Sequence, residues 1–241
     1  MIEGLPIYVS VFFILIVLLT IVFLFKSIIN LGISFKKITL IFFVLLIWII
    51  TQSMLAFSGF YSENPNILPP RIMLFGILPP LIVIVFLFIT KKRNYLKKNL
   101  LFINLINLNI IRLPVEIVLF LLFINGFVPE IMTFEGLNFD ILVGITAPLV
   151  AYFGITKKRL NYKAILAWNI VSILLLFNII ALAILSAPSP FQKLGFNQAN
   201  IAIFYFPFVL LPTFIVPVVL FAQLCTIYLL VGTRKIPIEN Y

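Results

Sequence analysis

The chain has 241 residues, of which 63% are hydrophobic and 10% are charged, and its mean hydropathy is +1.26. So few polar residues cannot cover the surface of a soluble domain of this length, and a water-soluble globular fold is therefore excluded. A net charge of +10 favours nucleic-acid binding only where the basic residues form a patch on a soluble surface. Here they stand in short segments between apolar runs, so we expect no nucleic-acid partner.

Seven apolar runs are separated by short segments that alternate between basic and either acidic or nearly neutral, the sixth segment containing only Lys193. About 20 apolar residues cross a bilayer as a helix, and short segments rich in Lys and Arg stay in the cytoplasm. The basic segments follow the odd-numbered runs, so the sequence predicts an all-α polytopic membrane bundle with its N-terminus outside and its C-terminus cytoplasmic. We expect one domain, residues 1–241, with neighbouring helices antiparallel. The predicted spans are 5–25, 38–60, 71–90, 100–125, 139–156, 164–186 and 201–231.

The first run, 5–25, is preceded by Glu3 and followed by Lys26. A cleaved signal peptide carries basic residues before its apolar core, so we expect this run to remain as a helix. The basic segments 91–98 and 157–163 follow the third and fifth runs, where they are expected to attract anionic lipid headgroups at the cytoplasmic face.

Prolines and glycines interrupt three of the runs. We predict that these spans kink or unwind, because proline lacks a backbone donor and clashes with the carbonyl four residues earlier. In lipid, such freed carbonyls are tolerated only where protein or water satisfies them, which is typical of transporter binding sites. The alternative is that the prolines only shape helix packing. The third run carries Pro69, Pro70, Pro79 and Pro80, the fifth carries Gly144 and Pro148, and the seventh carries Pro207, Pro212 and Pro217.

The fourth run contains Asn109, Arg112 and Glu116 at a spacing that places all three on one helix face. An unpaired charge at that depth costs roughly 3 kcal/mol or more. We therefore expect Arg112 and Glu116 to face the bundle interior and to pair with each other or with a third polar group such as Asp140. The alternative to a functional role is a buried ion pair that fixes the helix register.

Other polar residues are expected in the outer half of the membrane, where they would line a polar vestibule open to the outside. As a group they also suit ordinary hydrogen bonding between helices. The segment 128–140 places acidic residues among aromatic and apolar ones, so we expect it to fold back onto the rim of the bundle or to form an ordinary acidic loop. The vestibule candidates are Gln52, Arg71, Asp140, Asn178 and Tyr205, with Asn109, Arg112 and Glu116, and the rim-loop candidates are Glu130, Glu135 and Asn138.

A weak internal similarity suggests two triplets of spans, 1–98 and 139–241, joined by the span 100–125. Trp48 and Trp168 each lie in the second span of a triplet, and a Gly-Phe segment with a following Asn-Ile pair comes after each of those spans. A match between asparagine-rich segments also arises by chance, so the repeat stays a hypothesis.

The sequence contains no histidine, and its one cysteine is Cys225. An intrachain disulfide, a Cys/His zinc site and a Cys–His catalytic pair are thereby excluded. We expect no cofactor and no metal, and no motif decides whether the protein is an enzyme.

Three functions remain open. The first is a transporter or permeation protein for a small molecule or ion. The second is an intramembrane enzyme or ligand-binding sensor for an anionic or lipid-like molecule, since arginine binds carboxylate and phosphate well. The third is a subunit of a larger membrane complex. Frequent Ile, Phe, Asn and Lys indicate an AT-rich bacterial genome, and thus the plasma or inner membrane.

Overall fold

The chain folds as a bundle of long apolar helices in the computed structural model, which describes residues 2–28, 34–90 and 102–233. Within these ranges every regular element is helical. Six helices are long and apolar enough to cross a membrane, and a shorter one, Asp140–Thr156, occupies the fifth predicted run. The predicted class, a helical membrane bundle, is therefore confirmed. The six are α1 (Ile7–Ile28), α2 (Phe35–Phe57), η2 with α3 (Ile72–Ile89), α5 through α6 (Phe102–Ile124), α8 (Tyr162–Ser186) and η7 with α9 (Leu211–Gly232).

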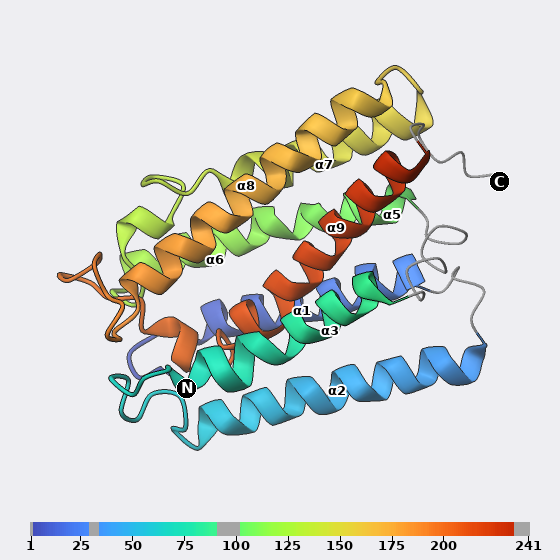
Figure 1. Cartoon of the computed structure of the whole chain (residues 1–241). Coiled ribbons are helices and arrows are strands. Elements are labelled where there is room, and N and C mark those ends of the chain that lie inside the picture. The colour runs from blue at the N-terminus through green and yellow to red at the C-terminus, as the bar shows by residue number, and fades with distance from the viewer. Residues whose placement is uncertain (1, 29–33, 91–101, 234–241) are drawn as a thin grey trace.

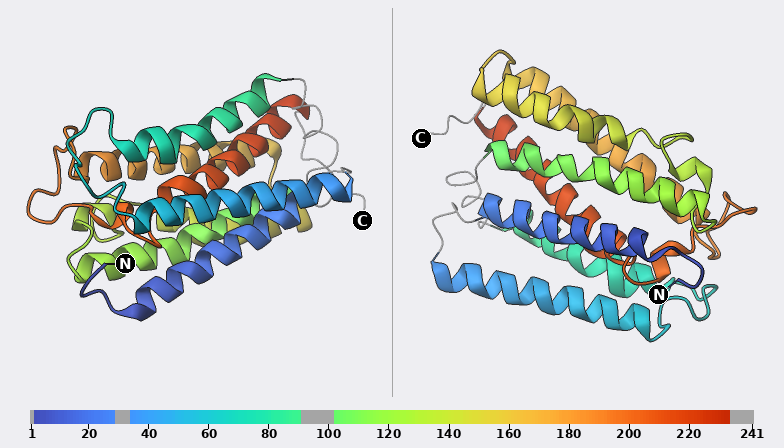
Figure 2. Two further views of the ribbon diagram at one scale, coloured as in Figure 1. Left: turned by 90° about the horizontal axis from the view of Figure 1, so that it is seen from below. Right: turned by 180° about the vertical axis from the view of Figure 1, so that it is seen from behind.

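Successive long helices run antiparallel, so the connections fall at two opposite ends of the bundle (Figures 1 and 2). The described loops 58–71, 125–139 and 187–205 lie at one end, together with Glu130 and Glu135. Lys36 and the basic segment 157–163 lie at the other end, which is the separation that the predicted topology requires. Several further basic residues, at 91–98 and at 234–235, lie outside the described residues. Which end faces the cytoplasm stays a prediction, which a reporter fused after Tyr241 tests.

The three runs predicted to be broken each contain a π-helical segment. These segments are η2 (Ile72–Ile77), η5 (Ala151–Thr156) and η7 (Leu211–Ile215). The seventh span begins at Leu211 instead of residue 201, because residues 201–210 form a 3-10 turn, η6 (Ala202–Phe204), followed by further turns. Pro207 and Pro212 account for this difference, since neither can donate within a regular helix.

The fourth run holds one irregularity that the sequence analysis did not predict. A 3-10 segment, η3 (Leu108–Ile111), joins α5 (Phe102–Asn107) to α6 (Arg112–Ile124). Pro114 explains its position, because its ring would clash with the carbonyl of Ile110 in a regular helix. A 3-10 turn eclipses side chains three residues apart, so it keeps Asn109 and Arg112 on one face.

Side chains of α2 satisfy backbone carbonyls that prolines leave free in other helices. Pro79 cannot donate to the carbonyl of Phe75, and Gln52 Nε2 donates to that oxygen at 3.0 Å. Pro217 likewise cannot donate to Thr213, and Trp48 Nε1 donates to that carbonyl at 2.9 Å. The expectation that protein groups satisfy the freed carbonyls is thus met at both sites.

The bundle is tight around α9 and open around α2. Over an apolar stretch of 18 residues in each span, 67% of the residues of η7–α9 are buried but only 11% of those of α2. A Cβ atom added at Gly76 of η2 would lie 2.7 Å from Thr213 Cγ2, so η2 and η7 touch closely beside the two α2 contacts. Thus α2 lies at the periphery, largely facing lipid, and is tied to the bundle by hydrogen bonds to two broken helices.

Candidate functional site

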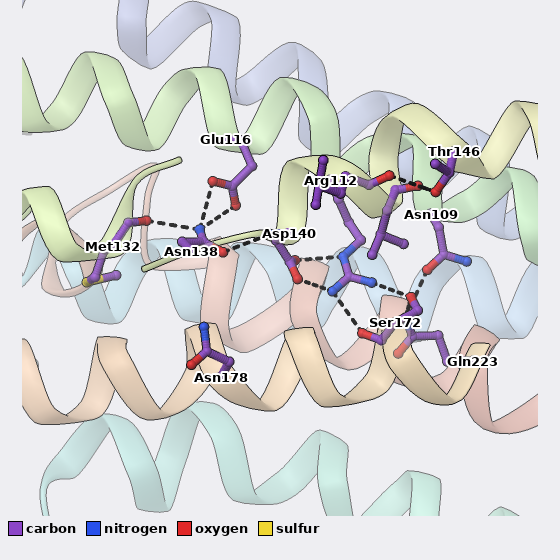
Figure 3. A network of polar contacts seen from close by, with 12 residues as sticks. Asn109, Arg112, Glu116, Met132, Asn138, Asp140, Thr146, Ser172, Asn178 and Gln223 are labelled. Carbon is purple, nitrogen blue, oxygen red and sulfur yellow. Dashed lines mark hydrogen bonds and ion pairs between the residues drawn. The ribbon is translucent and has the colours of Figure 1, made fainter. Parts of the chain in front are cut away.

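A buried ion pair joins Arg112, the first residue of α6, to Asp140, the first residue of α7 (Asp140–Val150). Arg112 Nε donates to Asp140 Oδ2 at 2.6 Å and Nη2 donates to Oδ1, so the contact is bidentate. The same guanidinium reaches α8, where Nη1 donates to Ser172 Oγ at 2.6 Å and Nη2 donates to the Ser172 carbonyl at 3.1 Å. Arg112 is 3% exposed and Asp140 4%. All three guanidinium nitrogens are therefore engaged inside the protein (Figure 3).

A glycine brings the two partners together. A Cβ atom added at Gly144 would lie 2.5 Å from the backbone nitrogen of Leu113, so α7 packs directly against the backbone of α6. Gly144 stands one helical turn after Asp140, and Leu113 directly follows Arg112. The close approach at Gly144 therefore places the Asp140 carboxylate beside the guanidinium.

Glu116 has a different environment, one turn along α6 from Arg112. Asn138 Nδ2 donates to both carboxylate oxygens of Glu116 at 2.7 Å, and also to the carbonyl of Met132 at 2.9 Å. Asn138 Oδ1 accepts from the backbone N–H of Asp140 at 3.1 Å, which fixes the orientation of the amide. Among the described residues no Lys or Arg nitrogen lies within 4.0 Å of Glu116, although Glu116 is only 1% exposed. Glu116 is thus a buried carboxyl held by an amide alone.

The network continues toward the middle of the bundle through amide and hydroxyl groups. Gln223 of α9 donates through Nε2 to Ser172 Oγ and, at 3.1 Å, to Asn109 Oδ1. Asn169 Nδ2 donates to the Gln223 carbonyl at 2.9 Å, while Asn169 Oδ1 and Gln223 Oε1 are buried and have no partner among the described residues. Ser172, Asn169 and Gln223 were not among the predicted binding residues. Asn169 and Ser172 share one face of α8 at a spacing of three residues, and that spacing could have identified them.

A cavity of about 210 Å³ lies against this network, and its lining includes residues of the loops 125–139 and 187–205, namely Met132, Ala187, Ser189 and Ile203. Its walls come from η2 and α3 on one side and from α8 on the other, with α6, η7 and α9 between them. Phe177, near the middle of α8, lines the cavity and is 52% exposed, so the cavity reaches the lipid-facing surface of the bundle. Apart from Arg112, Glu116, Asp140 and Ser189, every lining side chain is apolar.

Three of the predicted binding residues therefore share one cavity, and the others do not. Asn109 is buried behind Arg112 and donates to the carbonyls of Leu105 and Ile106, both at 3.2 Å. The remaining candidates have no place in the lining: Gln52 binds Phe75, Arg71 donates to the Phe60 carbonyl at 3.0 Å, Asn178 donates to Leu137 at 2.8 Å, and Tyr205 packs against the hydrophobic core.

The rim loop divides in the same way. Asn138 is fully buried at the centre of the network, whereas Glu130 and Glu135 are exposed. Met132 and Thr133 are also buried, so the segment folds back onto the bundle.

In the loop after α2, Tyr61 is 2% exposed and its hydroxyl donates to Gln52 Oε1 at 2.6 Å. Burial raises the pKa of Tyr61 to about 12, partly offset by this bond, so the hydroxyl stays a donor at neutral pH.

Arg112 and Glu116 face the interior, and Arg112 pairs with Asp140, the alternative predicted partner, because α7 packs so closely at Gly144, while Asn138 binds Glu116. One expectation needs correction. The expected polar vestibule is instead an apolar cavity with a charged cluster in its wall, since residues from η2, α3, α8 and η7 line most of it. No residue of α2 contributes to the lining.

Comparisons with protein-family models, with curated proteins and with solved structures found no match to this chain.

Proposed function

We propose that this protein is a transporter of the cell membrane whose cargo is an amphipathic, lipid-like molecule. The observation that carries this proposal is the cavity, in which a wall of Leu, Ile, Val and Pro side chains adjoins Arg112, Glu116 and Asp140. An apolar pocket with a few convergent polar groups is the usual form of a small-molecule site. The hydrocarbon part of the cargo lies along the apolar wall and extends between α3 and α8 into the bilayer, and its polar end lies at the charged cluster.

The broken spans support transport over simple binding. Ile72, Met73 and Ile77 of η2, together with Leu211 and Ile215 of η7, line the cavity. Irregular helices around a site inside the membrane are typical of carriers, and π-helical turns often occur at functional sites. Thus η2 and η7 are the elements that we expect to move during transport.

A single substitution tests this proposal. Ala183 of α8 lines the cavity, so Ala183→Trp should fill it, whereas Ala181 is exposed on the same helix and Ala181→Trp should not. In phosphatidylcholine vesicles, we expect the wild-type protein to carry at least one of dodecylammonium, dodecanol and dodecanoate across the bilayer faster than protein-free vesicles do. Ala183→Trp should lower that protein-dependent rate at least about 10-fold, the effect of about 1.4 kcal/mol.

The control variant Ala181→Trp should keep the wild-type rate, because its side chain adds volume only on the lipid side. Equal rates for the two variants, or no protein-dependent movement of any of the three probes, would contradict the proposal.

A second candidate is an intramembrane enzyme acting on the same class of molecule. The specific observation is that two carboxyl groups, those of Glu116 and Asp140, line one cavity in different hydrogen-bonding environments. Such a pair can divide acid and base roles between its members. Mass spectrometry of the lipids after incubation separates the two functions, since an enzyme leaves a covalently changed molecule and a transporter does not.

A further inference from the structure

We infer that the polar end of the cargo is cationic, an ammonium-type group that binds the Glu116 carboxylate. The inference deepens the proposed function and rests on it. It specifies which of the three charged groups in the cavity wall is open to a ligand, and therefore which head group fits.

The charges in the cavity wall are unbalanced. Arg112 and Asp140 neutralise each other through two hydrogen bonds, which leaves Glu116 without an opposite charge among the described residues. An ionised carboxylate that is 1% exposed and lacks a cation is costly at this depth. A ligand cation entering the cavity removes that cost, because it brings the missing charge to a site that is already built.

The hydrogen-bonding capacity of the cluster points the same way. Glu116 receives one amide nitrogen, Asn138 Nδ2, whereas a carboxylate offers about four acceptor positions. Arg112, in contrast, already donates from all three of its nitrogens to Asp140 and Ser172. An ammonium group therefore finds free acceptors at Glu116. Four of the five N–H groups of Arg112 are already engaged, so an anion cannot form two parallel bonds there without breaking the pair.

This reverses the expectation that an arginine in the membrane favours an anionic ligand. A carboxylate or phosphate at Arg112 would displace Asp140 and would stand in one cavity with two carboxyl groups. Like charges held that close in a low dielectric repel strongly. The arginine therefore holds Asp140 in place and does not serve as the ligand's counter-charge.

The test compares three probes of one chain length that differ only in the head group. The wild-type protein is placed in phosphatidylcholine nanodiscs at pH 7, and binding of dodecylammonium, dodecanol and dodecanoate is measured by titration calorimetry, with empty nanodiscs subtracted. We expect dodecylammonium to bind at least about 10-fold more tightly than dodecanol, and dodecanoate to bind most weakly.

Two variants identify the residue that is responsible. Glu116→Gln keeps the size of the side chain and its contact with Asn138 but removes the charge, so the preference for dodecylammonium over dodecanol should fall to within about 2-fold. Glu135→Gln removes the same charge from the exposed rim loop and should leave the preference unchanged. This control separates binding at Glu116 from general attraction of a cation to the protein.

The outcomes separate this inference from the function on which it rests. If Ala183→Trp weakens binding of the probes but the wild-type protein prefers dodecanoate or shows no preference, the cavity binds amphipathic molecules and the inference is wrong. A preference for dodecylammonium that Glu116→Gln leaves intact also overturns it. If Ala183→Trp binds all three probes as the wild-type protein does, the cavity is not their binding site, and both the proposed function and this inference are wrong. Should Glu116→Gln fail to fold, the order of the three probes on the wild-type protein still decides.

Discussion

Arg112 is the residue on which the buried network depends, because it connects α6 to both α7 and α8. Its guanidinium binds Asp140 through two nitrogens and Ser172 through two. Removing the arginine leaves a carboxylate in a low-dielectric interior, which costs more than the ion pair itself contributes. Removing both partners leaves no unpaired charge, so the remaining cost is that of the lost packing.

We therefore expect Arg112→Leu and Asp140→Leu each to destabilise the protein by about 3–5 kcal/mol. The double variant should lose clearly less stability than the sum of the two single losses. The melting temperature of the purified protein in one detergent measures this. Arg71→Leu is the matched control, because Arg71 is only half-buried and donates to a single carbonyl. If Arg112→Leu is no more damaging than Arg71→Leu, the pair does not stabilise the bundle.

At the scale of elements, α2 supports two broken helices from outside the tightly packed part of the bundle. Trp48 and Gln52 stand four residues apart, one turn on α2, and donate to Thr213 of η7 and to Phe75 of η2. Both acceptors are carbonyls that a proline four residues later leaves free. The irregular backbone beside the cavity is therefore stabilised by a helix that does not line it.

Trp48→Phe should cost about 1–3 kcal/mol, since the Thr213 carbonyl then lacks a donor inside the bilayer. Adding Pro217→Ala should recover much of the loss, because residue 217 regains a backbone N–H that can reach Thr213. Trp168→Phe is the control: Trp168 donates to the hydroxyl of Thr146 at 2.9 Å. That hydroxyl is a donor in its own right, to the Leu142 carbonyl at 2.7 Å, so removing Trp168 leaves it hydrogen-bonded. Thermal unfolding in detergent measures the stability of the wild-type protein, of Trp48→Phe, of Trp168→Phe and of the double variant with Trp48→Phe and Pro217→Ala. A double variant that is no more stable than Trp48→Phe would contradict this account.

Local chemistry was predictable from the sequence, and contacts between distant elements were not. The broken spans followed from the positions of the prolines, and the burial of Arg112 and Glu116 followed from the cost of charge in lipid. Which of its two predicted partners Arg112 takes did not follow, because it depends on how closely α7 approaches α6 at Gly144. The apolar cavity was missed for a similar reason, since it depends on the separation of α3 from α8.

At the scale of the whole molecule, the spans on opposite sides of the bundle differ in length. On one side α2 has 23 residues, whereas on the other side the apolar helical segment Asp140–Thr156 has only 17 (Figures 1 and 2). At 1.5 Å per residue, α2 is about 35 Å long and Asp140–Thr156 is about 25 Å, against a hydrocarbon core of about 30 Å. Leu142, Ile145 and Leu149 are about half exposed along α7, so the short side faces lipid.

The sequence predicts that Asp140–Thr156 crosses the bilayer, and a span that short creates a hydrophobic mismatch, so we expect the bilayer to become thinner on that side than beside α2. Local thinning lowers the distance over which any polar group has to cross hydrocarbon, and it does so on the face of the bundle next to Asp140. We expect the protein to be more stable in phosphatidylcholine with acyl chains of roughly 14 carbons than of roughly 22, as measured by thermal unfolding in vesicles. Equal stability in both lipids would contradict this expectation, and a membrane deformed around Asp140–Thr156 would then play no part in how this protein works.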